Sequence, residues 1–133
     1  MSQSLFAYGT LQPGCAPPQM AGVVARMRAA GEGFVRGRLY DLGGYPGAVP
    51  DESAEGKILG TVMELPDDAE ILRRLDAYEE CDALAPDASE YVRELREVEL
   101  ASGGRRTCWF YRYNGKTDAK RVIASGDWRK RDS

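Results

Sequence analysis

One segment of the chain combines the apolar spacing of a helix with an acid on its apolar side. In residues 66–79, a rotation of about 100° per residue brings the apolar side chains onto one face. These side chains belong to Ile71, Leu72, Leu75 and Tyr78. Glu79 projects between Ile71 and Leu72, toward the expected core. A carboxylate directed inward is costly unless it is paired, hydrogen-bonded or functional.

Glu79 therefore has two interpretations. Its place in the last helical turn, at the negative end of the helix dipole, raises the expected pKa of its carboxyl group. A raised pKa is what a general base or acid needs near neutral pH. Alternatively, Glu79 pairs with an arginine or caps a loop. At the other end of the segment, Asp67 and Glu70 have the spacing of a capping box, which predicts Asp67 as the helix cap.

The rest of the chain favours strands. Apolar or β-prone runs cover residues 5–8, 33–40, 57–65, 91–100 and 107–113, and residues 17–28 have weaker helical potential. The turn at residues 102–104 predicts a hairpin, and a shift of apolar phase between Leu95 and Val98 predicts a bulge in its first strand. Five or six strands with one strong helix indicate an α+β domain with a curved or closed sheet.

Composition narrows the possible functions. A length of 133 residues predicts a single domain, residues 1–133. The net charge of −3, with both signs interspersed, argues against nucleic-acid binding. No apolar run approaches the length of a membrane span, and the first residues lack the features of a signal peptide. Three cysteines without paired spacing fit a reducing cytoplasm, so we expect a cytoplasmic protein.

The sequence contains no histidine. Histidine-dependent triads, imidazole zinc sites and histidine bases are therefore excluded, and acid–base chemistry must come from other side chains. Cys81 lies two residues after Glu79, but the sequence shows no group that would activate its thiol. Neither metal-binding spacing nor a phosphate-binding glycine loop occurs. We expect no metal and no cofactor.

Two loops are candidates for ligand binding. Tyr8, Gly9, Thr10 and Leu11 follow the first strand, and the glycine allows consecutive N–H groups to face one carboxylate or oxyanion. An ordinary strand-to-turn junction explains the same residues. Tyr45 and Pro46, in a second glycine-rich loop, either line a pocket or cap the sheet.

Aromatic and basic side chains on the strands leave similar alternatives. Trp109, Tyr111 and Tyr113 share one strand face by alternation, and such a stripe serves either as core or as a pocket wall. Arg36 and Arg93 have apolar neighbours in their strands. Each either balances a buried carboxylate, binds an anionic substrate or is solvated at a sheet edge.

Taken in order, the motifs resemble the γ-glutamylcyclotransferase-like superfamily, in its branch of small AIG2-like proteins. The matching pieces are residues 6–11, 37–40, 45–49, 60–62, 75–79, 90–93 and 125–128, which span nearly the whole chain. The resemblance implies a small mixed β-barrel flanked by helices, with the site at one mouth of the barrel.

The resemblance also implies roles for individual residues. The loop from Tyr8 to Leu11 would hold the γ-glutamyl part of a substrate through its backbone. Glu79 would be the acid/base, and Tyr91 would line the cavity. A second cavity tyrosine is expected on the later aromatic strand, where Tyr111 and Tyr113 both qualify.

The implied reaction is an internal attack of the α-amine on the γ-carbonyl of a γ-glutamyl compound, which releases 5-oxoproline and an amine. The expected partner is that small molecule, with no nucleic acid and no membrane, and the protein is expected to be a monomer or weak homodimer. Alternatives are a non-catalytic ligand-binding member or an interaction module. One departure is Glu80, which stands where the family usually has glycine. We expect the helix to continue slightly there, with Glu80 in solvent.

Overall fold

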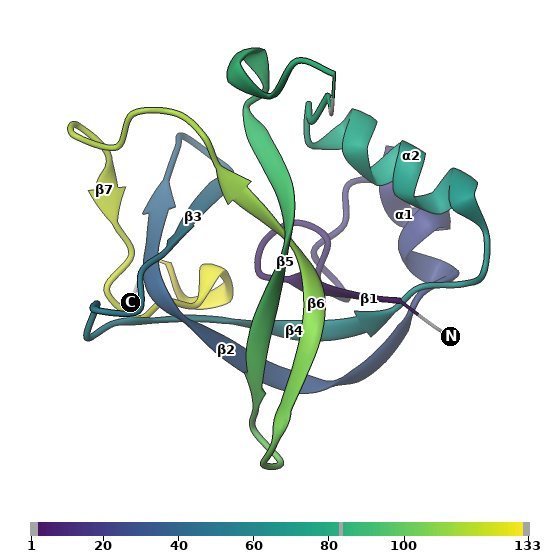
Figure 1. Ribbon diagram of the computed structural model, residues 1–133, viewed down its shortest axis with the longest axis horizontal. Helices are drawn as coiled ribbons and strands as arrows, with labels where there is room; N and C mark the ends of the chain where they lie inside the picture. Colours follow the sequence, from purple (N-terminus) through teal and green to yellow (C-terminus); the bar gives the residue numbers. More distant parts are fainter. Residues whose placement is uncertain (1–2, 83, 132–133) are drawn as a thin grey trace.

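The computed structural model describes residues 3–82 and 84–131. Within them, strands dominate and two α-helices lie on one side of the sheet (Figure 1). The elements are β1 (Ser4–Ala7), α1 (Pro18–Ala25), β2 (Arg28–Asp41), β3 (Pro46–Pro50), β4 (Lys57–Glu64), α2 (Ala69–Tyr78), β5 (Tyr91–Leu100), β6 (Arg105–Tyr113) and β7 (Arg121–Val122), with 3-10 turns at Pro86–Ala88 and Trp128–Lys130. Neither α-helix in this described part is long and apolar enough to cross a membrane.

Five of the strands close into a ring. β1 pairs with β4, β4 with β2, β2 with β5, β5 with β6, and β6 returns to β1. The β1–β6 pair is parallel and the other four are antiparallel. β3 lies between β2 and β6, and β7 extends β2. The predicted α+β fold, a small mixed β-barrel flanked by helices, is confirmed.

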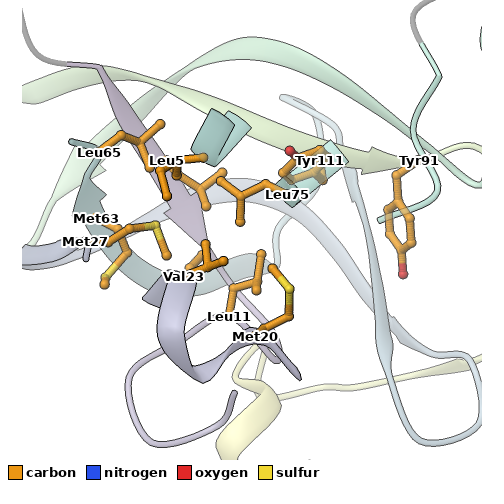
Figure 2. Packing of buried hydrophobic residues seen from close by; sticks show 12 residues of the cluster. Leu5, Leu11, Met20, Val23, Met27, Met63, Leu65, Leu75, Tyr91 and Tyr111 are labelled. Carbon is orange, nitrogen blue, oxygen red and sulfur yellow. The ribbon is translucent and has the colours of Figure 1, made fainter. Parts of the chain in front are cut away.

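Every residue of β1 is buried because both faces of this strand are covered. Phe6 points into the barrel interior, where it stacks on Phe110 with ring centroids 5.9 Å apart. Leu5 points to the other side, where it joins the apolar faces of the two helices. In Figure 2, Leu5 and Leu75 meet Met20 and Val23 in this second cluster. Burial of each such side chain contributes about 1.5–3 kcal/mol, so α2 is held firmly against the barrel.

Helix α2 begins one residue later than expected. Asp68, not Asp67, is the cap: its backbone is extended and its Oδ1 accepts a hydrogen bond from the Glu70 N–H at 3.0 Å. Glu70 is then the second helical residue, too close to the cap to form the predicted capping box. The predicted inward face is correct, since Ile71 and Leu75 are buried.

The predicted hairpin is present, but the predicted bulge is wrong. β5 and β6 pair without a register shift from Tyr91 opposite Tyr113 to Glu99 opposite Arg105. The apolar phase shifts because Leu95 faces solvent, with 57% of its surface exposed. The register instead shifts in β2, in a short irregular stretch opposite β4.

Candidate active site

A cavity of about 310 Å³ lies where β1 and α2 end and β5 begins. Its lining residues are Leu5, Phe6, Ala7, Tyr8, Gly9, Thr10, Leu11, Tyr45, Pro46, Tyr78, Glu79, Glu80, Glu90, Tyr91 and Tyr111. A volume near 300 Å³ is at the small end of the range for ligand sites. The cavity is therefore suited to a small molecule of a few amino-acid units at most.

Nearly all the candidate site residues meet at this cavity. Glu79, the loop from Tyr8 to Leu11, Tyr45, Pro46 and Tyr91 line it, and so does Tyr111. The structure thereby distinguishes the two aromatic candidates on β6.

Tyr113 does not line the cavity. Its ring packs edge-on against Tyr91 at 5.7 Å and fills the space beside Gly47, where a Cβ would lie 2.8 Å from the Tyr113 Cγ. Its place is behind the cavity wall, so Tyr113 supports Tyr91 and does not face a ligand.

Glu79 is a half-buried carboxyl group in this cavity. Its backbone N–H donates to the Leu75 carbonyl at 3.0 Å, which holds it at the end of α2. Burial, followed by the negative charge of Glu90, raises the pKa of Glu79 to about 8. In residues 3–82 and 84–131, no hydrogen bond or ion pair engages the Glu79 carboxylate: Arg93 pairs with Asp76, and Arg36 donates to the Ala54 carbonyl. The alternative of a glutamate paired with an arginine is not observed.

The helix does not continue past Glu79, contrary to expectation. Glu80 adopts a left-handed backbone with φ of 51°. Its N–H donates to the Ala77 carbonyl at 3.2 Å, and the Cys81 N–H donates to the Asp76 carbonyl at 2.9 Å. This pair of bonds is a Schellman motif, in which glycine is the usual left-handed residue. Glu80 thus takes the conformation that the family's glycine favours, and its side chain is exposed as expected.

An ion-pair network fixes the last turn of α2 to the β5–β6 hairpin. The Asp76 carboxylate accepts hydrogen bonds from Arg93 at 2.8 and 3.2 Å and from the Tyr111 hydroxyl at 2.7 Å. The Arg93 guanidinium also lies 4.3 Å from the centre of the Trp109 ring. Because Asp76 is one turn before Glu79, this network holds the helix end at the cavity.

The loop after β1 is held from both sides. The Tyr8 hydroxyl donates to the Tyr111 carbonyl at 2.6 Å, and the Thr10 and Tyr78 hydroxyl oxygens are 2.7 Å apart. Gly9 packs directly against Pro46: a Cβ at Gly9 would lie 2.4 Å from the Pro46 Cγ. Among the described residues, the N–H groups of residues 9–11 have no hydrogen-bond acceptor. Three N–H groups beside the cavity therefore remain available to a ligand.

Three of the tyrosines that line the cavity are kept neutral by burial. Burial raises the pKa of Tyr8, Tyr91 and Tyr111 well above the usual value for tyrosine. The Tyr91 hydroxyl donates to the Pro46 carbonyl at 2.5 Å. A phenol that stays protonated cannot act as the base, so Glu79 is the best-suited proton acceptor in the cavity. No group of three or more metal-ligating side chains occurs in the part of the chain that the structure describes.

Three polar lining residues were missed by the sequence analysis as site residues. Tyr78 counted only as an apolar residue of the helix, Glu80 as a solvated one, and Glu90 only as the first residue of the matching piece 90–93. Glu90 accepts a hydrogen bond from Tyr45 at 2.7 Å, which raises the pKa of Tyr45 to about 12. Its position directly before Tyr91, a predicted cavity residue, was the sequence feature that indicated Glu90 as a member of the site.

The fold and the site define a class of protein: a mixed β-barrel with a half-buried glutamate, unpaired among the described residues, in a cavity beside a glycine-containing loop. The chain belongs to the family described as gamma-glutamyl cyclotransferase, AIG2-like, whose model matches residues 5–130. It is similar to the gamma-glutamylcyclotransferase family protein YtfP of Escherichia coli (strain K12), with 37% identity over 95 residues, 71% of this chain and 70% of that protein.

Solved structures agree with this assignment. The solution structure of ytfP from Escherichia coli has a TM-score of 0.64 and 30% identity, and the match covers 98% of this chain and 100% of that one. YkqA from Bacillus subtilis has the same fold, with a TM-score of 0.71 and 24% identity over 98% of this chain. The match covers only 40% of the YkqA chain.

Proposed function

We propose that the protein is a γ-glutamyl cyclotransferase that converts a γ-glutamyl compound to 5-oxoproline and a free amine. The observation that carries this proposal is the state of Glu79: its carboxyl group lies in an open cavity with a pKa of about 8 and accepts no hydrogen bond from any residue that the structure describes. A base of this kind is matched to a proton on an amine near neutral pH. Family membership supports the same chemistry.

The proposed reaction begins when ionised Glu79 takes a proton from the α-ammonium group of the substrate. The freed amine attacks the γ-carbonyl carbon of the same molecule, a C–N bond forms, and the five-membered ring closes. Glu79 then gives this proton to the departing nitrogen as the original amide bond breaks. Ionised again, Glu79 accepts the second proton from the new ring nitrogen and passes it to the released amine, which leaves as an ammonium ion. One carboxyl group thus moves two protons in turn.

The surrounding residues would supply orientation and electrostatic stabilisation. The free N–H groups of residues 9–11 are placed to bind the substrate carboxylate or the oxyanion that forms on the γ-carbonyl. The walls formed by Tyr91 and Tyr111 restrict a flexible γ-glutamyl chain and exclude water. Holding the amine near the carbonyl removes much of the entropic barrier to cyclisation, worth several kcal/mol.

The test is a screen of γ-glutamyl dipeptides, γ-glutamyl-amines and glutathione for release of 5-oxoproline. At least one class should be turned over, and Glu79→Gln should reduce the rate at least about 1,000-fold while thermal unfolding shows an intact fold. Glu55→Gln, an exposed residue outside the cavity, is the matched control. Full activity of Glu79→Gln would show that Glu79 is not the base.

A further inference from the structure

The mouth of the cavity carries two acids besides Glu79. Glu80 is exposed at the end of α2, and Glu90 is half-buried just before β5. The Glu90 N–H donates to the Glu80 carbonyl at 3.1 Å, which ties the two backbones together. The Glu90 carboxyl group, first by hydrogen bonding and then by its negative charge, raises the pKa of Glu80. Both side chains line the cavity.

Within residues 3–82 and 84–131, no positive side chain lines the cavity to balance this pair. Among the described residues that line it, none is a lysine or arginine. The arginine nearest along β5, Arg93, is engaged by Asp76. The Tyr45 hydroxyl donates one hydrogen bond to Glu90 and brings no charge. The outer part of the cavity is therefore negative, whereas the free N–H groups that would take a carboxylate belong to the loop after β1.

This distribution of charge distinguishes between leaving groups. The γ-glutamyl end of a substrate has both charges, which the loop and Glu79 would accommodate. The part beyond the scissile amide would extend past Glu80 and Glu90. A carboxylate there would meet the negative charge of this pair, whereas an ammonium group would be attracted by it.

We propose that Glu80 and Glu90 select γ-glutamyl substrates whose leaving group ends in a positively charged amine and has no carboxylate, such as a γ-glutamyl diamine. This inference rests on the proposed cyclotransferase activity and names its substrate class. Glu80 and Glu90 would be specificity-determining residues, distinct from Glu79, which handles the proton.

The experiment uses three synthetic substrates of matched length that differ only in the end of the leaving group. They are the γ-glutamyl derivatives of 1,4-diaminobutane, pentylamine and 5-aminopentanoate, with a positive, neutral and negative end. At low ionic strength, kcat/KM should be at least about tenfold higher for the positive than for the neutral compound, and lowest for the negative one. Because salt screens charges at an open mouth, 0.5 M NaCl should reduce this preference in the unaltered protein.

The double variant Glu80→Gln/Glu90→Gln should lose at least about tenfold of the preference for the positive over the negative compound. Taking this ratio within each variant removes general effects on turnover. Glu55→Gln should keep the full ratio of kcat/KM for the positive over the negative compound. Glu80→Gly is a second way to remove the Glu80 carboxylate, because glycine is the residue best suited to the left-handed backbone at this position.

Equal kcat/KM for the three compounds, or a salt-independent preference that survives the double variant, would overturn this inference and leave the cyclotransferase proposal intact. Failure of all three, and of the wider screen, to release 5-oxoproline would instead overturn the proposed function. Calorimetric binding of the same three compounds then decides the charge preference: tighter binding of the positive compound that the double variant loses supports it, and any other order refutes it.

Discussion

The hydroxyl oxygens of Thr10 and Tyr78 lie 2.7 Å apart and connect the two halves of the cavity. Thr10 belongs to the loop after β1, and Tyr78 is the last residue of α2. Because Glu79 follows Tyr78 directly, this hydrogen bond sets the separation between the loop N–H groups and the carboxylate. It is a positioning contact for the proposed reaction.

Removal of this contact should impair turnover more than folding. A net hydrogen bond of about 1 kcal/mol corresponds to a five- to tenfold loss of kcat, which we expect for Tyr78→Phe. Thr10→Val should have a similar effect, and the double variant should be no worse than either single one, because both remove the same contact. Release of 5-oxoproline and thermal unfolding measure the two effects. Strictly additive losses would show that the two hydroxyls act independently.

The activity should rise with pH through about 8. Glu79 must be ionised to accept a proton, and its pKa is about 8, so kcat/KM should show an acid limb there. Glu90→Gln should move this limb to lower pH, because the Glu90 charge is the second cause of the raised pKa. Glu55→Gln should leave the limb in place. A limb near pH 4.5 in the unaltered protein would contradict the assignment of Glu79.

The same carboxyl group should weaken the fold at alkaline pH. The folded state holds the Glu79 proton up to about pH 8, whereas an unfolded glutamate loses it near pH 4.3. The folded state therefore binds more protons between these values, and the free energy of unfolding should fall as pH rises from about 4.3 to about 8. Glu79→Gln has no proton to lose, so it should be more stable by about 1–3 kcal/mol at pH 8 and equal near pH 4. Urea unfolding at both pH values tests this, and an unchanged difference would contradict it.

Glu80→Gly should stabilise the protein. Glutamate pays a steric cost in the left-handed conformation at φ of 51° that glycine does not. Part of the gain is offset by the greater freedom of glycine in the unfolded chain, so Tm should rise by about 2–5 °C. The matched control is Arg74→Gly on the exposed side of α2, which should lower Tm because its backbone is helical. A lower Tm for Glu80→Gly would mean that the Glu80 side chain contributes to stability.

The sequence was informative where local spacing determines structure. The helical period placed Glu79 beside the buried face of α2, and the glycine after the first strand identified a loop that lines the cavity. The helix cap was missed by one residue because Asp67 and Asp68 both qualify by side chain, and only the backbone conformation separates them. The phase shift at Leu95 predicts a bulge that is absent, because sequence alone does not reveal that this apolar residue faces solvent.

Features that depend on distant segments were less predictable. Tyr111 and Tyr113 share one face of β6. The alternation of side chains along a strand does not show which of the two lines the cavity. The boundary is set by Gly47, which lies in β3 and admits the Tyr113 ring. Glu90 was missed for a similar reason: it joins the site only because β5 starts beside the end of α2, where its N–H bonds to the Glu80 carbonyl.

The close packing of Gly9 on Pro46 affects the proton affinity of Glu79, although neither Gly9 nor Pro46 has a titratable side chain. The wall of the cavity closes because a methyl group is missing at position 9, where it would overlap the proline ring. An alanine there would push apart the two loops and admit more solvent, which would lower the pKa of Glu79. The absence of a side chain at Gly9 thus helps to shield the proposed base from bulk water.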